Sequence, residues 1–352
     1  MNIIKKILCM VLILGLAAGA LAACQPAAGT TGESPSAAEQ ASASDESVKV
    51  GVVTDMGIDE AEWLQNLVAG LDAYMAEHSD LDIKVVEATD VSEFEPKVRT
   101  LAEAGYQIII TMFSDMADAT IAVANDYPDI LFGSLDGTIA NLDQYKNIEE
   151  FGLNRTQTAF MAGVVAASSS KTGKVGIVAG ADEPIINAIV AGWQQGLVYA
   201  NPQIEDVVVY ANSFTDPTKG KELALSLYNK GYDVIGAAAG GTGVGSAQAA
   251  AEVNGLFVAW DVHYPEVFGD KALELGSAVN YFDVMVLQFI SDAAGGKFQA
   301  GVRVDYGMAE GVCDFESLDN APLSDETKAL VEKAKAEILA GSITLSTEPL
   351  HK

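Results

Sequence analysis

Cysteine is scarce in this chain of 352 residues, and the few cysteines exclude a disulfide scaffold. The three are Cys9, Cys24 and Cys313. Cys9 lies inside an apolar stretch near the start of the chain, and Cys24 follows that stretch. Cys313 is therefore the one thiol in the rest of the sequence, which we call the body. No disulfide framework is possible within one such body. A large hydrophobic core must stabilise it instead, and about 300 residues suffice for two ordinary domains.

Histidine is equally scarce, and its positions argue against an enzyme. His78, His263 and His351 are far apart and show no metal-ligand spacing. The chain has no Gly-x-Ser-x-Gly nucleophile elbow. We therefore expect no catalytic residue, no metal and no cofactor. For His263, two residues after Asp261, a place in a binding site and a purely structural role both remain open.

A glycine-rich segment at residues 240–245 (GGTGVG) is the candidate for a phosphate loop. It lacks the third glycine of a dinucleotide fingerprint and the Gly-Lys-Ser/Thr of a P-loop. Two interpretations remain. Either a backbone amide at Gly241 contacts a neutral polar ligand, or the glycines only permit a tight turn from strand to helix.

Basic residues are few. Of 20 Lys and Arg, Lys5 and Lys6 fall in the first segment, and the remaining 18 stand against 49 Asp and Glu, a formal net charge of −31. Such a chain repels phosphate-rich partners, which excludes nucleic acid as a partner. Most of the acidic residues are interpreted as a solvated surface.

The first 47 residues predict export and anchoring rather than a folded domain. Residues 1–23 have two lysines, an apolar run and small residues before Cys24, which is typical of a lipoprotein signal peptide ending in a lipobox. An uncleaved membrane helix is disfavoured because the apolar run is shorter than the ~20 residues that span a bilayer. Cys24 would carry the lipid. Residues 24–47 contain no aromatic or branched aliphatic residue. Such a segment cannot bury enough apolar surface to fold, so it is predicted to be a flexible tether.

The body alternates strand-like and helix-like segments, which predicts an α/β fold of parallel sheets. Short β-branched runs are expected as strands at 49–55, 82–88, 107–112, 130–136, 174–180, 207–212, 234–240 and 256–261. Helical patterns occupy 60–77, 93–104, 115–125, 184–199, 217–230, 243–254 and 324–340. The segments form two sets, each opening with a similar strand (KVGVV at 49–53, KVGIV at 174–178). Two related doubly wound lobes follow from this repetition.

Polar residues follow many of the predicted strands, among them Asp55, Asp136 and Asp261. Ligands of open α/β sheets bind beyond the carboxyl ends of the strands. The two lobes are therefore expected to face each other across a cleft lined by carboxylates and amides.

Three motifs taken together resemble the basic membrane protein (BMP) family, the purine nucleoside receptor-like lipoproteins that serve as substrate-binding components of ABC transporters. The first is residues 54–63 (TDMGIDEAEW) with Gly70. The second is residues 159–167 (AFMAGVVAA) followed by 170–176 (SKTGKVG). The third combines residues 213–216 (SFTD), 219–221 (KGK) and 239–243 (AGGTG) with Asp261. The similarity covers residues 49 to about 311.

The resemblance implies a type I periplasmic-binding-protein-like fold that closes on a nucleoside, purine favoured, by hinge motion. It places residues 48–153 and about 281–300 in lobe I, and residues 154–280 and about 301–352 in lobe II. It further implies a monomeric, extracytoplasmic receptor that is bound to the membrane through Cys24 and serves an ABC permease and ATPase complex. The expected ligand-binding residues are Asp55, Asp59, Trp63, Phe113, Asp136, Phe214, Gly241, Asp261 and Asn280.

Some of these residues have a second interpretation. Trp63 stacks on the base by resemblance, but it also fits a core anchor of the first helix. Phe214 is expected on the opposite face of the base, or in the core. Asp55 and Asp59 bind base or ribose edges, or cap the first helix, for which Asp59 is well placed.

The chain departs from the family pattern at four positions: Glu62 replaces a serine, Trp63 a phenylalanine, Leu64 an asparagine and Asn280 a ribose-contacting lysine. The last two changes motivate an alternative function, a sensory or scaffolding lipoprotein that binds a sugar or another small polar ligand.

Overall fold

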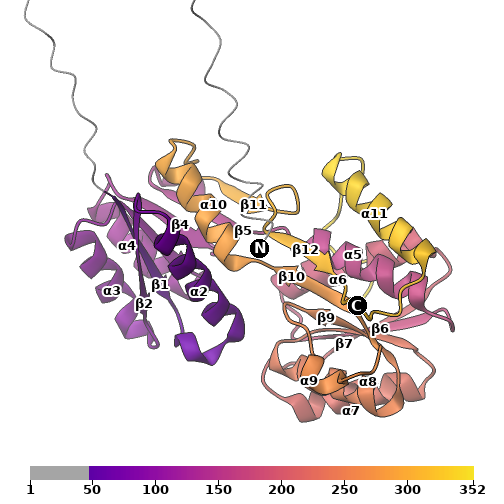
Figure 1. The fold of residues 1–352 in the computed structure, drawn as a ribbon. Helices are drawn as coiled ribbons and strands as arrows, with labels where there is room; N and C mark the ends of the chain where they lie inside the picture. The colour runs from indigo at the N-terminus through magenta and orange to yellow at the C-terminus, as the bar shows by residue number, and fades with distance from the viewer. Residues whose placement is uncertain (1–46) are drawn as a thin grey trace, which may run out of the picture. The chain divides into compact units, whose positions relative to one another are not determined.

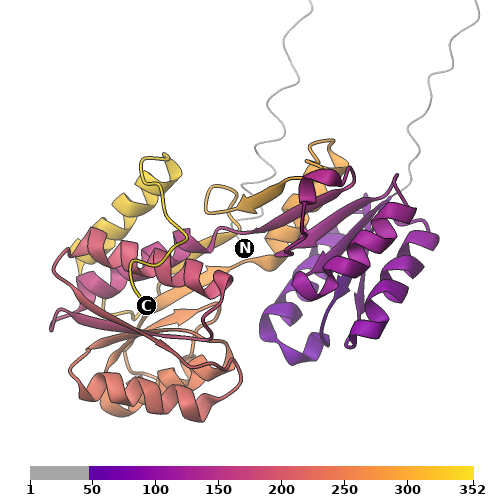
Figure 2. The same cartoon turned by 180° about the vertical axis from the view of Figure 1, so that it is seen from behind.

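Two β-sheets of six strands each, flanked by helices, make up the body of the protein (Figure 1 and, from behind, Figure 2). The computed structural model describes residues 47–352, which form one compact unit, Ser47–Lys352. Cys24 and the expected signal peptide and tether lie outside the described residues, apart from residue 47. Within residues 47–352, no helix combines the length and the apolar character needed to cross a membrane.

The first sheet has the strand order β11-β5-β4-β3-β1-β2, and all its strand pairs are parallel. Its strands are β1 (Val48–Thr54), β2 (Leu81–Glu87), β3 (Ile108–Met112), β4 (Leu131–Leu135), β5 (Ile148–Leu153) and β11 (Arg303–Tyr306). Helices α2 (Glu62–Glu77) and α10 (Phe282–Ala294) cover one face, and α3 (Val91–Glu103) and α4 (Ala117–Asp126) cover the other. The short turns η1 (Ile58–Glu60), η2 (Ser114–Met116) and η3 (Leu142–Gln144) join these elements. Because both faces are covered, β3 is buried along its whole length.

The second sheet has the order β12-β10-β9-β8-β6-β7. Its strands are β6 (Lys174–Ala179), β7 (Glu205–Tyr210), β8 (Val234–Ala238), β9 (Leu256–Trp260), β10 (Glu274–Asn280) and β12 (Cys313–Glu316), of which β12 runs antiparallel to β10. Helices α5 (Arg155–Ser169) and α6 (Pro184–Ala200) pack on one face; α7 (Pro217–Asn229), α8 (Gly241–Val253) and the short α9 (Pro265–Phe268) pack on the other. Helix α11 (Asp325–Leu339) lies against α5.

The chain passes between the two lobes three times, from β5 to α5, from β10 to α10 and from β11 to β12. The sequence predicts that the chain returns to lobe II near residue 301, but in the structure this return comes later. Strand β11 pairs with β5, with Arg303 opposite Glu150 and Tyr306 opposite Leu153, so the return follows Tyr306. An edge strand of four residues (RVDY) has too short a pattern to be assigned to a sheet from sequence.

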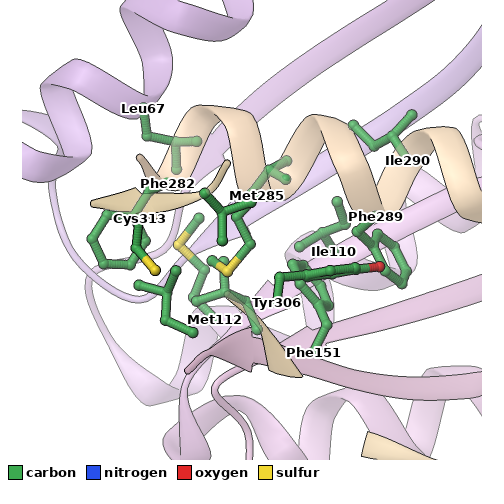
Figure 3. Close-up of a cluster of buried hydrophobic side chains, with 14 of the residues drawn as sticks. Leu67, Ile110, Met112, Phe151, Phe282, Met285, Phe289, Ile290, Tyr306 and Cys313 are labelled. Carbon is green, nitrogen blue, oxygen red and sulfur yellow. The ribbon is translucent and has the colours of Figure 1, made fainter. Parts of the chain in front are cut away.

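A cluster of buried side chains fixes α10 on the first sheet (Figure 3). Phe289 stacks on Phe151 of β5 with ring centroids 4.2 Å apart and planes 7° apart. Leu67 of α2 and Cys313 of β12 belong to the same cluster. Burial raises the pKa of the Cys313 thiol to about 12, so the thiol is protonated at neutral pH and serves as an apolar core residue.

Candidate ligand-binding site

A cavity of about 230 Å³ lies where α2 meets the carboxyl ends of β9 and β10. It combines three aromatic side chains, two carboxyl groups, two amide side chains and three aliphatic side chains. Its lining residues are Trp63, Asn66, Leu67, Asp261, Val262, Val279, Asn280, Tyr281, Phe282 and Asp283. Three residues that the sequence nominated, Trp63, Asp261 and Asn280, therefore meet in one cavity, although they are up to 217 positions apart in the chain.

Trp63 lies in the first turn of α2 and is half-buried. Its ring centroid is 4.8 Å from that of Phe282 and 5.8 Å from that of Phe113, the latter in an edge-to-face arrangement. These contacts hold the indole in one orientation. The two interpretations of Trp63 are thus compatible, because the ring packs on the core and also lines the cavity. The neighbouring Leu64, by contrast, is fully buried in the core.

Asp261 follows β9 directly and is the central residue of a very tight turn. Its φ is 61°, and the Val262 amide donates to the Trp260 carbonyl oxygen at 2.7 Å. A turn of this i to i+2 kind with positive φ is rare and strained. The Asn280 amide donates to Asp261 Oδ1 at 2.6 Å, while the buried Asn280 Oδ1 accepts no hydrogen bond within residues 47–352. Buried polar atoms normally have a partner, so this oxygen is free to receive a donor from a ligand.

The carboxyl group of Asp261 is open to solvent in the cavity, yet protein surrounds it on most sides. This desolvation raises the pKa of Asp261, and the Asn280 hydrogen bond and the charge of Arg155 only partly oppose the rise. Asp55, at the end of β1, has a similar environment. Burial raises the pKa of Asp55, and its buried Oδ1 accepts no hydrogen bond from the described residues.

Asp136 lies in a second cavity, of about 480 Å³, rather than beside Trp63. Arg155 donates to both of its carboxylate oxygens, at 3.1 and 2.7 Å, and Arg303 donates to Oδ1 at 3.1 Å. Burial by itself would raise the pKa of Asp136, but the two guanidinium groups outweigh it and hold the pKa below its usual value. Asp136 is therefore an ionised carboxylate whose acceptor positions are largely occupied by arginine.

Phe214 and Gly241 lie together at the strand ends of the second lobe. Phe214 is 38% exposed, and its carbonyl oxygen accepts a hydrogen bond from the Thr242 amide at 3.2 Å. A Cβ atom at Gly241 would lie 3.2 Å from the same oxygen, and Gly240 has a φ of 52°, so the glycines are needed for the turn. The close packing and positive φ of this turn therefore explain the two glycines. The Phe214 ring remains partly exposed at the strand ends.

Asp59 is exposed in η1 and contributes only its carbonyl oxygen, which accepts from Gln65 at 3.4 Å. It does not cap the first helix, since the N-cap of α2 is Ala61 without a side-chain hydrogen bond. The structure therefore does not bring Asp59 to the cavity that holds Trp63.

Three of the predicted ligand-binding residues have a strained backbone conformation. Phe113, Asp136 and Asp261 have φ values of 60°, 48° and 61°, and each directly follows a strand. Such conformations cost about 1–3 kcal/mol and persist where the surroundings enforce them, often at functional sites.

Arg155 is the main residue that sequence reasoning missed. The chain has three arginines, Arg99, Arg155 and Arg303, and two of them pair with Asp136. In a chain with only three arginines, each arginine is itself a usable signal. Asn66 and Tyr281 also line the cavity, and nothing local in the sequence marks them.

Comparison with known proteins is consistent with this geometry. A family model described as "ABC transporter substrate-binding protein PnrA-like" matches residues 47–347. The chain belongs to this family, Bmp. A relative from Lactococcus lactis subsp. cremoris, named "ABC transporter nucleoside-binding protein BmpA", is 28% identical over 320 residues, which cover 86% of this chain and 90% of the relative.

Solved structures of solute-binding proteins share the fold of this Bmp-family protein. One from Aeropyrum pernix K1 has a TM-score of 0.67 at 23% identity, covering 86% of this chain and 94% of its own. Another, from Conexibacter woesei, has a TM-score of 0.69 at 21% identity, covering 86% and 99%. The predicted fold class and the family resemblance are confirmed.

Membership in the Bmp family also settles the broad class of function. The chain is an ABC transporter substrate-binding protein, which is an extracytoplasmic binding protein and not an enzyme. A small-molecule ligand and a membrane transporter are its partners in that class.

Proposed function

We propose that this protein captures a nucleoside, preferentially a purine nucleoside, between its two lobes and delivers it to an ABC permease and ATPase complex. The observation that carries the proposal is the cavity in which Trp63, Asp261 and Asn280 meet. An aromatic face beside hydrogen-bond acceptors is what a flat base joined to a hydroxylated sugar requires.

In the proposed complex the base stacks on Trp63, and the ribose hydroxyl groups donate to Asp261. The Asn280 Oδ1 atom, buried without a partner, accepts from a hydroxyl or amino group of the ligand. Asp55 supplies a second free acceptor from the first lobe. Phe214 covers the other face of the base, Gly241 offers backbone contacts beside it, and Phe113 supports Trp63. Asp136 acts by holding Arg155.

The preference for purines follows from ring area, because a bicyclic base overlaps the indole more fully than a pyrimidine does. The Lactococcus relative, a protein named for nucleoside binding, supports a nucleoside as the ligand class.

Isothermal titration of the purified protein with adenosine, guanosine, inosine, uridine and cytidine tests the proposal. We expect heat of binding with purine nucleosides and weaker or no heat with the pyrimidine nucleosides. Absence of heat with all five, at protein concentrations that detect micromolar binding, overturns the nucleoside assignment. Binding of a free sugar instead supports the sensory or scaffolding alternative.

We further propose that Cys24 carries the lipid that holds the protein at the membrane. The support is the lipobox ending at Cys24 and the polar segment after it. Substituting Cys24→Ser is expected to release most of the protein from the membrane fraction, since two buried acyl chains supply the anchoring free energy. Detergent phase partitioning and mass spectrometry of the mature N-terminus measure this. Unchanged partitioning of the C24S variant contradicts the assignment, and Cys9→Ser serves as the matched control.

A further inference from the structure

His263 lies in the loop that leaves the ligand cavity, and its two ring nitrogens face two carboxyl groups. Nδ1 is hydrogen-bonded to Glu274 of β10, and Nε2 lies 3.8 Å from Oε2 of Glu316 in β12. The hydrogen bond at Nδ1 and the nearby carboxylate at Nε2 both favour the protonated imidazolium, whose positive charge lies between two carboxylates. In this form the ring links two strands of the second sheet, β10 and β12.

One end of the bridge, Glu316, reaches a residue of the ligand cavity, and the other end, Glu274, holds the loop that follows Asp261. Glu316 accepts a hydrogen bond from the hydroxyl of Tyr281, which lines the cavity at the passage from β10 to α10. Glu274 is 3% exposed, and it also accepts from the Tyr264 amide at 3.0 Å. The segment after Asp261 is thus fastened to β10 by two consecutive residues, His263 and Tyr264.

The strained turn at Asp261 needs such fastening. A residue with a φ of 61° in an i to i+2 turn relaxes unless its neighbours hold it. The bonds of His263 and Tyr264 to Glu274 begin two residues further on and oppose that relaxation. A buried carboxylate such as Glu274 also requires a counter-charge, which the imidazolium provides.

We propose that His263 is a positioning residue for ligand binding: as an imidazolium between Glu274 and Glu316, it holds the turn that presents Asp261 to the ligand. This inference rests on the proposed function at the same cavity. It makes ligand affinity depend on pH through a group that does not touch the ligand.

The direction of the pH effect follows from the surroundings of the ring. The titratable groups that face it are Glu274 from β10 and Glu316 from β12, with Asp261 and Tyr264 on its own loop and Tyr281 beyond Glu316. The hydrogen bond to Glu274 raises the pKa of His263 above 6.5, against the opposing effect of burial, and the charges of Glu274 and Glu316 raise it further. The bridge is therefore favoured on the acidic side of 6.5 and is lost as the pH rises through the raised pKa of His263.

Titrations with adenosine between about pH 6 and pH 9.5, which brackets a raised histidine pKa, test the proposal. Wild-type affinity is expected to fall about tenfold on the alkaline side, with its midpoint at the pKa of His263. The His263→Gln variant, which keeps one neutral donor, is expected to bind about tenfold more weakly than the wild type at about pH 6 and to lack the alkaline fall. The His78→Gln variant, altered at the end of α2, should retain the wild-type profile. A wild-type affinity that is flat with pH, or a His263→Gln variant that keeps both affinity and slope, overturns the proposal.

An NMR titration of the ligand-free protein separates failure of this inference from failure of the proposed function. The His263 ring signal should titrate above pH 6.5 in the wild type and at lower pH in Glu274→Gln. A His263 pKa at or below that value refutes the bridge whatever the ligand is. An elevated pKa without adenosine binding at any pH upholds the bridge and refutes its role in binding this nucleoside.

Discussion

Replacing Arg155 with methionine is expected to lower the free energy of unfolding by about 3 kcal/mol, since breaking a buried ion pair leaves an uncompensated charge. The side chain of Asp136 is 1% exposed and that of Arg155 is 12% exposed. Without Arg155, the carboxylate keeps only the more exposed Arg303 as a partner. Chemical denaturation of the two proteins at neutral pH measures the difference.

Two further variants make this expectation specific. In Arg155→Met combined with Asp136→Asn, no buried charge remains unpaired, and asparagine tolerates the positive φ at this position, so much of the lost stability should return. Arg99→Met removes an exposed arginine with surface partners and should change the free energy of unfolding little. Equal losses in Arg155→Met and Arg99→Met would contradict a buried ion pair.

The same pair gives stability a defined dependence on pH. Because the folded-state pKa of Asp136 lies below the usual 3.8, its contribution is complete above that value and is lost as the pH falls through the lower folded-state pKa. Substituting Asp136→Asn should remove this part of the acid dependence.

Truncating Trp63 to alanine is expected to weaken nucleoside binding by about 1–3 kcal/mol, the usual value of one base stacked on an aromatic side chain. This corresponds to a roughly five- to 150-fold rise in Kd. Trp63→Phe keeps an aromatic face and should lose much less. Isothermal titration measures both, and denaturation corrects for the packing that Trp63 contributes to Phe113 and Phe282.

Intrinsic fluorescence gives an independent measure of the same contact. The chain has three tryptophans, and Trp193 and Trp260 are 0% and 6% exposed. A stacked base should quench mainly Trp63, so the fluorescence change on adding nucleoside should disappear in Trp63→Phe. A full change in that variant would place the base away from Trp63.

Most helices and strands could be predicted because their patterns are local. The eight predicted strands and seven predicted helices correspond to elements of the structure within a few residues at each end. Strand β5 (IEEFGL) was missed because two consecutive glutamates break the apolar pattern. Glu149 and Glu150 are buried there because they accept hydrogen bonds from the Gln299 and Ile139 amides of distant loops. Helix α5 has no polar face to predict, since residues from Ala159 to Ala167 are all buried between α6, α11 and the sheet.

The candidate site was predictable to a lesser degree. The ends of strands identified Asp55, Asp136 and Asp261 as candidates, because chain direction puts such residues at one edge of a sheet. Strand order then separated them. Asp136 follows β4, whose neighbour β5 in turn pairs with β11, so Arg155 after β5 and Arg303 in β11 both reach it. Nothing within a few residues of Asp136 specifies a partner 167 positions away.

By itself the sequence determined the class of fold, the scarcity of reactive groups and the family. These depend on composition, short-range periodicity and motifs, which are properties of neighbouring residues. The tertiary structure alone decided which residues meet: Trp63 with Asp261 and Asn280, Asp136 with two arginines, and His263 with Glu274 and Glu316. Pairing in space depends on strand order and on the three passages between lobes, and these are set by the packing of the whole chain.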